Sequence, residues 1–164
     1  MALTLDGTNG ITFNNSTVQA SAGQVLQVVQ VVKTDTFSSA TGSYVDVTGL
    51  SASITPKFAT SKILVLVNVS VGAFANCLFN LLRNSTNICQ STGATVNSTT
   101  NVGYPYSYSM LTIPISFLDS PATTSSTTYK IQMYSFSGTS YINARSTDQY
   151  YGGTSSVTLM EIAA

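Results

Sequence analysis

The residues best suited to bind a ligand are tyrosines in two polar segments of the chain. A tyrosine presents a rigid ring with a polar tip at a low cost in conformational entropy, and neighbouring Ser, Gly and Asn add adaptable hydrogen bonds. Sugars and proteins both bind to surfaces of this composition. The sequence therefore predicts a binding site from these residues: Tyr104 and Tyr106 in NVGYPYSYSM, and Arg145, Asp148, Tyr150 and Tyr151 in ARSTDQYYGG.

The first tyrosine group has a second interpretation. Tyr104, Tyr106 and Tyr108 are two residues apart, so in a strand they would share one face and pack across the sheet or a subunit interface. Tyr150 and Tyr151 lie in a polar loop, where binding residues are common. Ligand contact and packing both stay open for the first group.

Catalysis finds little support among the ionisable residues. The chain has no histidine, so a Ser-His-Asp or Cys-His arrangement cannot form. A glycosidase would need two carboxylates. We expect Asp46 and Glu161, which lie between apolar neighbours, to face solvent from strands, and Asp119 to cap the turn in LDSP. The remaining carboxylates are Asp6, Asp35 and Asp148. The sequence predicts no enzymatic activity and no cofactor.

Neither cysteine predicts a disulfide or a metal site. Cys77 and Cys89 flank a predicted hairpin with its turn at residues 84–86, so Cys89 falls opposite Leu81 or a near neighbour and not opposite Cys77. A disulfide is then geometrically difficult, and we expect buried free thiols. Because the chain has no pair of CxxC motifs for zinc and no Asp-rich loop for calcium, we predict no bound metal.

The composition points to an uncharged β-protein. Only 7% of the 164 residues are charged, six basic residues balance six acidic ones, and 24 serines and 24 threonines supply polar surface. Such a chain has no basic patch to neutralise the phosphates of a nucleic acid. Because 43% of the residues are hydrophobic, the chain is expected to fold. Its abundant Thr, Val and Tyr favour strands, while the usual residues of exposed helices are scarce.

One apolar segment, residues 63–82, has the length and the flanking Lys62 and Arg83 of a membrane-spanning helix. All of its odd-numbered positions, however, are apolar, and its asparagines fall on even ones, which predicts two strands joined near Gly72. The asparagines would also share one stripe of a helix, so the membrane helix is kept as the alternative. We expect no membrane insertion.

The sequence from Val25 onward predicts about ten strands separated by polar turns, enough for a sandwich, jelly roll or barrel. The expected strands are VLQVVQVVKTDTF, SYVDVT, SASIT, KILVLVNVSV, AFANCLFNLLR, ICQS, YSYSMLTIPISFL, TTYKIQMYSF, SYINAR and SSVTLMEI. At the start of this region Gln24, Gln27, Gln30 and Lys33 recur at every third position. We interpret this repeat as a strand covered on both faces, in which each glutamine finds a partner.

Residues 1–24 differ from the rest of the chain. Two short apolar runs, which contain Leu3, Leu5, Ile11 and Phe13, are separated by Asp-Gly and Asn-Gly turns. The segment is too short to bury itself, so we predict a docking arm followed by a jelly-roll domain over residues 25–164. An edge hairpin of that domain is the alternative for the arm.

A neutral chain with so few charges has little protection against self-association. If three copies pack around an axis, the polar Ser/Thr faces become hydrogen-bonded interfaces and exposed strand edges are covered. We therefore expect a homotrimer.

Five fragments of the chain occur in a characteristic order and spacing. They are LTLDGTNGITFNNSTVQ, VLQVVQVVKTDTFSS, YVDVTGLSASITP followed by SKILVLV, FLDSPATTSSTTYKIQM, and SSVTLMEI. Together they resemble the fibre and adhesin proteins of tailed bacteriophages, particularly those of cyanobacteria. The resemblance covers nearly the whole chain. It implies a trimeric β-sandwich head, similar to a tumour-necrosis-factor-like jelly roll, that is fixed to the virion by its amino-terminal segment.

The same resemblance implies a protein that resides in the virion and contacts a glycan or protein of the host cell surface, and the expected free thiols fit synthesis in the host cytoplasm. The chain departs from long fibres because no shaft, coiled coil or repeat lies between Gln19 and Val25. Its reach is short, so a capsid decoration or spike protein without a receptor role is the alternative function. The copy number in the particle distinguishes the two roles.

Overall fold

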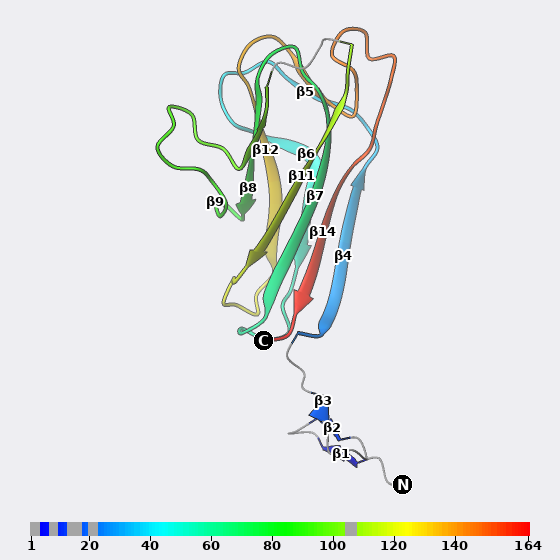
Figure 1. The fold of residues 1–164 in the computed structure, drawn as a ribbon, viewed down its shortest axis with the longest axis vertical. Helices are drawn as coiled ribbons and strands as arrows, with labels where there is room; N and C mark the ends of the chain where they lie inside the picture. The colour runs from blue at the N-terminus through cyan, green and yellow to red at the C-terminus, as the bar shows by residue number, and fades with distance from the viewer. Residues whose placement is uncertain (1–3, 7–9, 13–17, 20–22, 104–107) are drawn as a thin grey trace.

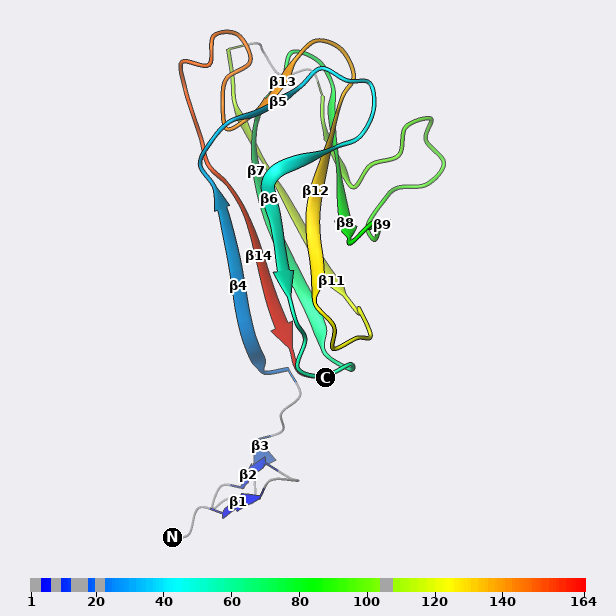
Figure 2. The same cartoon turned by 180° about the vertical axis from the view of Figure 1, so that it is seen from behind.

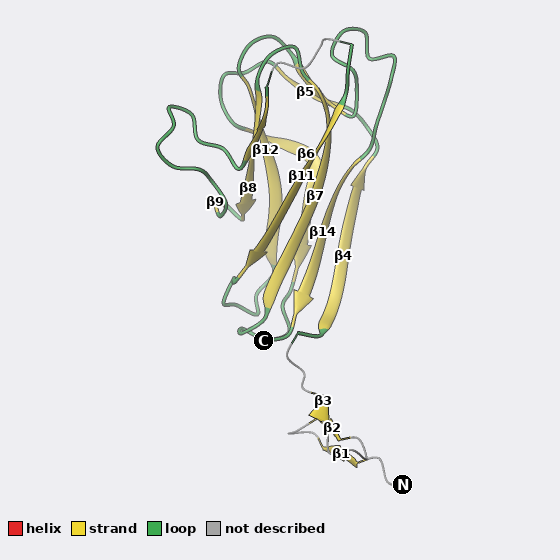
Figure 3. Cartoon of the chain, in the orientation of Figure 1, coloured by secondary structure: helices red, strands yellow, loops and turns green. Residues whose placement is uncertain are grey.

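A computed structural model describes residues 4–6, 10–12, 18–19, 23–103 and 108–164, which form strands and loops without a helix (Figure 3). Three short strands come first: β1 (Thr4–Asp6), β2 (Gly10–Thr12) and β3 (Val18–Gln19). The strands that follow are β4 (Val25–Lys33), β5 (Phe37–Ser39), β6 (Val45–Ile54), β7 (Lys62–Gly72), β8 (Cys77–Arg83), β9 (Thr86–Asn87), β10 (Thr100–Val102), β11 (Leu111–Asp119), β12 (Thr127–Ser135), β13 (Ser140–Ile142) and β14 (Ser155–Ile162).

The longer strands build two antiparallel sheets that face each other (Figures 1 and 2). The first sheet has the order β4-β14-β7-β11, and β13 and β5 extend it beside the end of β7. The second sheet has the order β6-β12-β8-β10, with β9 paired to β8. This strand order wraps the chain around one core as two Greek keys, which is consistent with a jelly roll. The predicted all-β sandwich is confirmed.

The core lies between the sheets and follows from the alternation of side chains along each strand. The odd-numbered residues of β7, from Ile63 to Val71, are buried, and they face the buried residues Ile131 and Met133 of β12. The prediction of two strands in residues 63–82 is confirmed, because β7 ends at Gly72 and β8 begins after a short turn. No helix in the described part of the chain is long and apolar enough to cross a bilayer.

Several strand boundaries differ from the prediction. Residues 45–54 form one strand and not two, because Gly49, with a φ of 80°, lies in the bulge where the pairing of β6 with β12 shifts register. The predicted strand ICQS is a loop after β9, and residues 37–39 form the separate strand β5. In the strand predicted over residues 106–118, the described residues 108–110 are not strand, and β11 begins at Leu111.

The interpretation of the first strand of the sandwich as covered on both faces is wrong. β4 is an edge strand of the first sheet, and Val28 is 55% exposed. Its glutamines do have partners on the neighbouring strand β14. Gln27 Nε2 donates to Glu161 Oε2 (2.5 Å), and Gln30 Nε2 donates to Thr158 Oγ1 (2.9 Å). The glutamines at every third position therefore reflect hydrogen bonds to β14 on alternate faces of the sheet. They do not indicate that other elements cover both faces of β4.

The short strands β1, β2 and β3 pair with one another and share no sheet with the sandwich among the described residues. Leu5 lies opposite Ile11 in this pairing. Leu3 and Phe13 lie outside the described residues. That residues 1–24 dock on another protein stays a prediction.

The chain enters the sandwich beside its own carboxyl terminus. Gly23 N donates to Ala163 O (2.7 Å), and Ala163 N donates to Gln24 O (2.8 Å). Both termini of the jelly-roll domain therefore lie at one end of the sandwich (Figure 1), which we call the terminal end. The opposite end, which we call the loop end, carries the β7–β8 turn and the loops that precede and follow β13 (Figure 2).

The outer face of the first sheet presents twelve uncharged residues, of which seven are apolar. Its side chains form three rows across the four strands, set by the strand register. From the terminal end the rows are Val28-Met160-Leu64-Leu118, Gln30-Thr158-Leu66-Ser116 and Val32-Ser156-Asn68-Pro114. None of these residues is charged, and Lys62 lies beyond the first row at the start of β7. We call these three rows the apolar face.

Candidate functional site

The loop between β13 and β14 carries most of the predicted binding residues, and Asn143 fixes its start. The φ of Asn143 is 61°, and its side-chain amide donates to the carbonyl oxygens of Lys33 (2.8 Å) and Asp35 (3.0 Å). The Ser155 hydroxyl donates to Asn143 Oδ1 (2.6 Å), and Asn143 N donates to Ser70 O (2.8 Å). The loop therefore begins at a buried residue, Asn143, whose side-chain amide is fully hydrogen-bonded.

Gly72 allows this loop to pack against the end of β7. A Cβ atom at Gly72 would lie 2.8 Å from Ser146 N and 3.0 Å from Arg145 Cα, and closer still to the carbonyl oxygen of Ala144. These atoms belong to the backbone and cannot turn away as the end of a flexible side chain can. A side chain at position 72 would displace the segment that carries Arg145.

Arg145 and Asp148 form a bidentate ion pair within the loop. Arg145 Nε donates to Asp148 Oδ1 (2.7 Å), and Arg145 Nη2 donates to Asp148 Oδ2 (2.5 Å). The hydrogen bonds from Arg145 and from the backbone amide of Tyr150 hold the pKa of Asp148 below its usual range, and Asp148 in turn raises the pKa of Arg145. The pair balances its own charge, so it contributes no net charge to the loop.

Two tyrosine rings contact the Arg145 guanidinium. Its Cζ atom lies 4.5 Å from the ring centroid of Tyr151 and 5.6 Å from that of Tyr108, within the range of a cation–π interaction. Tyr150 meets Tyr151 edge to face, with ring centroids 5.1 Å apart and an interplanar angle of 90°. Tyr150 is 77% exposed, so its ring is open to a ligand. We call this group the tip cluster: Tyr108, Arg145, Asp148, Tyr150 and Tyr151.

The structure brings four of the predicted site residues together in the tip cluster, and Tyr108 joins them from the segment before β11. Tyr108 lies in a turn with its side chain exposed, so the interpretation of this residue as part of a strand is wrong, while its packing at a subunit interface stays a prediction. Tyr104 and Tyr106 lie outside the described residues, and their roles stay predictions.

Glu161 is buried and not solvent-facing, contrary to the prediction. It shares the inner side of β14 with Val157 and Leu159, so alternation places it inside the sandwich. Burial alone would raise the pKa of Glu161. Hydrogen bonds from the Gln27 side chain and from the backbone N–H of Lys57 (2.7 Å) outweigh burial and hold this pKa below its usual range.

Asp119 is also buried, and it is the last residue of β11 rather than a cap of the following turn. Both of its carboxylate oxygens accept a hydrogen bond from Arg83 Nη1 at 2.9 Å, and Oδ2 also accepts from the Tyr129 hydroxyl (2.6 Å). Burial and this hydrogen bond raise the pKa of Tyr129. Because Arg83 and Tyr129 belong to the second sheet, the cluster ties the two sheets together.

The cysteines are free thiols, as predicted, with Cys77 buried and Cys89 half-buried. Burial raises the pKa of Cys77 to about 12, so its thiol stays protonated at neutral pH and is a poor nucleophile. In the described residues no group of three or more His, Cys, Asp or Glu is placed to hold a metal ion.

Sequence reasoning missed two exposed phenylalanines at the loop end. Phe74 is 52% exposed in the β7–β8 turn, and Phe136 is 62% exposed just after β12. A signal was present, because Phe74 interrupts a run in which the flanking Ala73 and Ala75 occupy the buried positions. Phe136 likewise follows the inward-facing Ser135 and so falls on the outward side.

Comparison with known proteins gives structural matches only. The sequence matches no protein-family model and no curated protein. Among solved structures, a chain of infectious bursal disease virus, Gx strain, aligns with 13% identity and a TM-score of 0.43. A chain of the Gt strain of the same virus aligns with 14% identity and a TM-score of 0.47. Each alignment covers 100% of this chain and 42% of the viral chain, so the chain spans less than half the length of these matches.

Proposed function

We propose that the chain is a structural protein of a virus particle: a short trimeric fibre head, attached through residues 1–24, that contacts the host cell with its loop end. The separation of the two ends carries this proposal. Residues 1–24 join the sandwich at Gly23, whereas the tip cluster lies at the other end of β14 (Figure 1). The 8 residues of β14 place about 26 Å of extended strand between them. The resemblance of five sequence fragments to phage fibre proteins supports the same assignment.

The chemistry of the tip cluster supports a binding role at the loop end. Its exposed tyrosine rings are held in place by a self-neutralised ion pair, so a ligand would meet a rigid amphipathic surface at a low entropy cost. The ionisable groups do not favour catalysis. Every aspartate whose side chain is described forms an ion pair with a lysine or arginine.

The apolar face supports self-association into a trimer. A face with exposed residues such as Val28 and Leu118, 55% and 50% exposed, normally marks an interaction surface. Its three rows contain no charge, so two copies of the face, or the face and a strand edge, approach each other without repulsion or a buried unpaired ion. Packing around a three-fold axis would also cover the exposed edge strand β4.

Binding of labelled recombinant protein to a panel of bacteria tests the receptor role. We expect binding to some strains only, and a loss of about tenfold or more in the double variant Tyr150→Ser/Tyr151→Ser. Phe58→Ser removes an exposed ring at the terminal end and is the matched control, with binding unchanged. Equal binding by the double variant and the unmodified protein would contradict a receptor site in the tip cluster.

Immunolabelling of virus particles tests the virion role separately. A few labelled trimers at the tail support the fibre head. Label over the whole capsid, in hundreds of copies, would contradict the fibre head and favour the role of a capsid decoration protein. Particles that carry no label would contradict both.

A further inference from the structure

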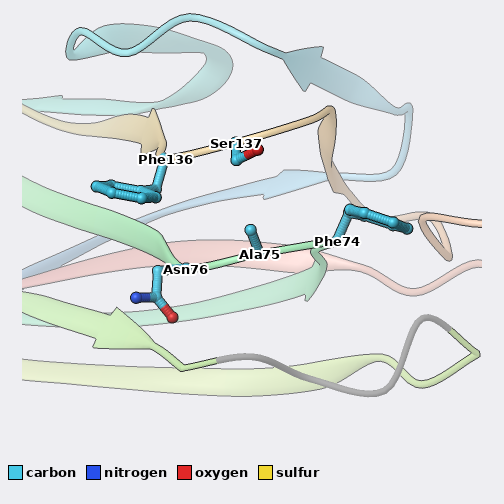
Figure 4. A pocket seen from close by; sticks show the side chains of 5 residues that line it. All are labelled: Phe74, Ala75, Asn76, Phe136 and Ser137. Atoms are coloured by element: carbon cyan, nitrogen blue, oxygen red, sulfur yellow. The ribbon is translucent and has the colours of Figure 1, made fainter.

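A hollow at the loop end lies apart from the tip cluster and has the lining of a small binding site. Its volume is about 370 Å³, and it is lined by Phe74, Ala75 and Asn76 of the β7–β8 turn and by Phe136 and Ser137 after β12 (Figure 4). This volume falls within the range of about 300–1,000 Å³ that is usual for small-molecule sites. The hollow is therefore large enough for one or two sugar rings.

The two walls of the hollow are joined by hydrogen bonds. Phe136 N donates to Asn76 O (3.0 Å), which holds the end of β12 against the β7–β8 turn. The Ser135 hydroxyl donates to Gly138 O (2.9 Å) and lies 2.8 Å from the Ser140 hydroxyl, which closes the loop after Phe136. Both phenylalanines therefore stand on backbone that is already ordered before a ligand arrives.

Gly138 also sets the position of the Phe74 ring. A Cβ atom at Gly138 would lie 3.3 Å from Cδ1 of Phe74, and the φ of Gly138 is 68°, a conformation that favours glycine. The ring packs against the bare backbone of this turn and keeps its outer side exposed. Phe74 is thus positioned by the fold without being buried by it.

Packing of the core does not require a phenylalanine at position 74 or at position 136. The inward positions of the turn are filled by the buried Ala73 and Ala75, and the inward position before Phe136 is filled by the buried Ser135. A polar side chain in place of either phenylalanine would leave this packing intact. Two exposed rings that share one hollow are therefore best explained by a ligand.

The lining identifies the chemistry of that ligand. Two phenyl rings offer apolar faces for the C–H side of a sugar, and the exposed Asn76 amide and Ser137 hydroxyl can donate and accept hydrogen bonds with its hydroxyl groups. No ionisable side chain lines the hollow, so nothing in it would compensate a charged ligand. A protein partner would need an interface of about 20–30 residues on each side, far more than this hollow provides.

We propose that the Phe74–Phe136 hollow binds an uncharged sugar unit. The hollow lies at the end of the molecule that the proposed function assigns to host contact, and only the source of the sugar, a host surface glycan, rests on that proposed function.

Saturation-transfer NMR with the full chain and a set of uncharged probes tests the site: methyl glycosides of glucose, galactose, mannose and N-acetylglucosamine, and disaccharides of these, at millimolar concentration. We expect saturation transfer to at least one probe and a dissociation constant raised about tenfold or more in Phe136→Ser and in Phe74→Ser. Phe58→Ser, which removes an exposed ring at the terminal end, is the control variant, with affinity unchanged. Thermal unfolding of each variant shows that the sandwich is intact.

Three results would overturn the site: no transfer to any probe, transfer that survives both phenylalanine variants, or binding of N-acetylphenylalanine amide in the hollow without binding of any sugar. Sugar binding in the hollow by a protein that attaches to no bacterium would instead leave this site standing and contradict the proposed host contact.

Discussion

The two sheets of the sandwich place their carboxylates on opposite sides. In the first sheet Lys33, Asp119 and Glu161 point inward and are buried, while the apolar face outside carries no charge. In the second sheet the inner side carries no carboxylate, and the outer side presents an ion pair between Asp46 and Lys130, with Lys130 Nζ 2.7 Å from Asp46 Oδ2.

The outer side of the second sheet is satisfied by its own side chains. Asp46 accepts a further hydrogen bond from Gln132 Nε2 (2.8 Å), and the hydroxyls of Ser53 and Thr128 lie 2.7 Å apart. The expectation that Asp46 faces solvent is confirmed. We call this surface the polar face.

The difference shows how a chain with few charges can divide them between stability and solubility. Buried charges are tolerated only with dedicated partners, and each one in the first sheet has them. The polar face keeps its charges in water, where they favour solvent over another protein surface. The apolar face, free of charge, is the side of the sandwich that suits contact with a second copy.

The largest expected effect comes from placing a charge on the apolar face. Met160→Glu puts a carboxylate in the middle of the first row, and each copy of a symmetric interface would bury it without a partner. We expect association to weaken about 1,000-fold or more, which corresponds to about 4 kcal/mol, measured by light scattering after size exclusion.

Ser51→Glu on the polar face is the control for this charge. The new carboxylate would lie opposite Lys130, in solvent, and we expect the oligomer to keep its mass. If the unmodified chain is a monomer, or if Ser51→Glu alone dissociates it, the assignment of the two faces is wrong.

The next largest effect concerns the tie between the sheets. Asp119→Ala leaves the buried Tyr129 hydroxyl without its acceptor and Arg83 without its counter-ion. We expect the free energy of unfolding to fall by about 3 kcal/mol in urea titrations. Asp119→Asn, which keeps one acceptor oxygen, should lose less, and an equal loss in both variants would point to the charge and not to the hydrogen bonds.

Much of this arrangement was predictable from side-chain alternation. The period of two in β7, β12 and β14 is strong enough to define the sandwich. The same period places Glu161 inside with Val157 and Leu159, although a charged side chain is usually found in solvent. Arg145 and Asp148 could be grouped from the sequence because one short loop carries both.

Other features depend on distant segments and could not be predicted in this way. Phe74 and Phe136 come from loops far apart in the sequence, and only the pairing of β8 with β12 brings them to one hollow. The apolar face has the same origin, since its rows arise from the register of four strands. Each strand alone shows only a few outward apolar residues of the kind that every protein surface contains.

A smaller effect on stability is expected from the buried carboxylate of Glu161. The folded-state pKa of Glu161 lies below its ordinary value of 4.5, so between the two values the unfolded chain binds more protons. The stabilisation is present above pH 4.5 and is lost as the pH falls through the folded-state pKa. Glu161→Gln should lower the free energy of unfolding at neutral pH by about 1–2 kcal/mol and flatten its decline in acid. An unchanged acid profile would contradict this role.

The smallest expected effect is on the polar face. In a double-mutant cycle with Asp46→Ala and Lys130→Ala, we expect a coupling of about 0.5 kcal/mol, because the pair is open to water and screened by salt. This coupling energy decides which face is buried in the oligomer, because contact with a second copy would remove water from the ion pair between Asp46 and Lys130. A coupling of about 2 kcal/mol or more that persists in high salt would place the polar face in the interface and the apolar face in solvent.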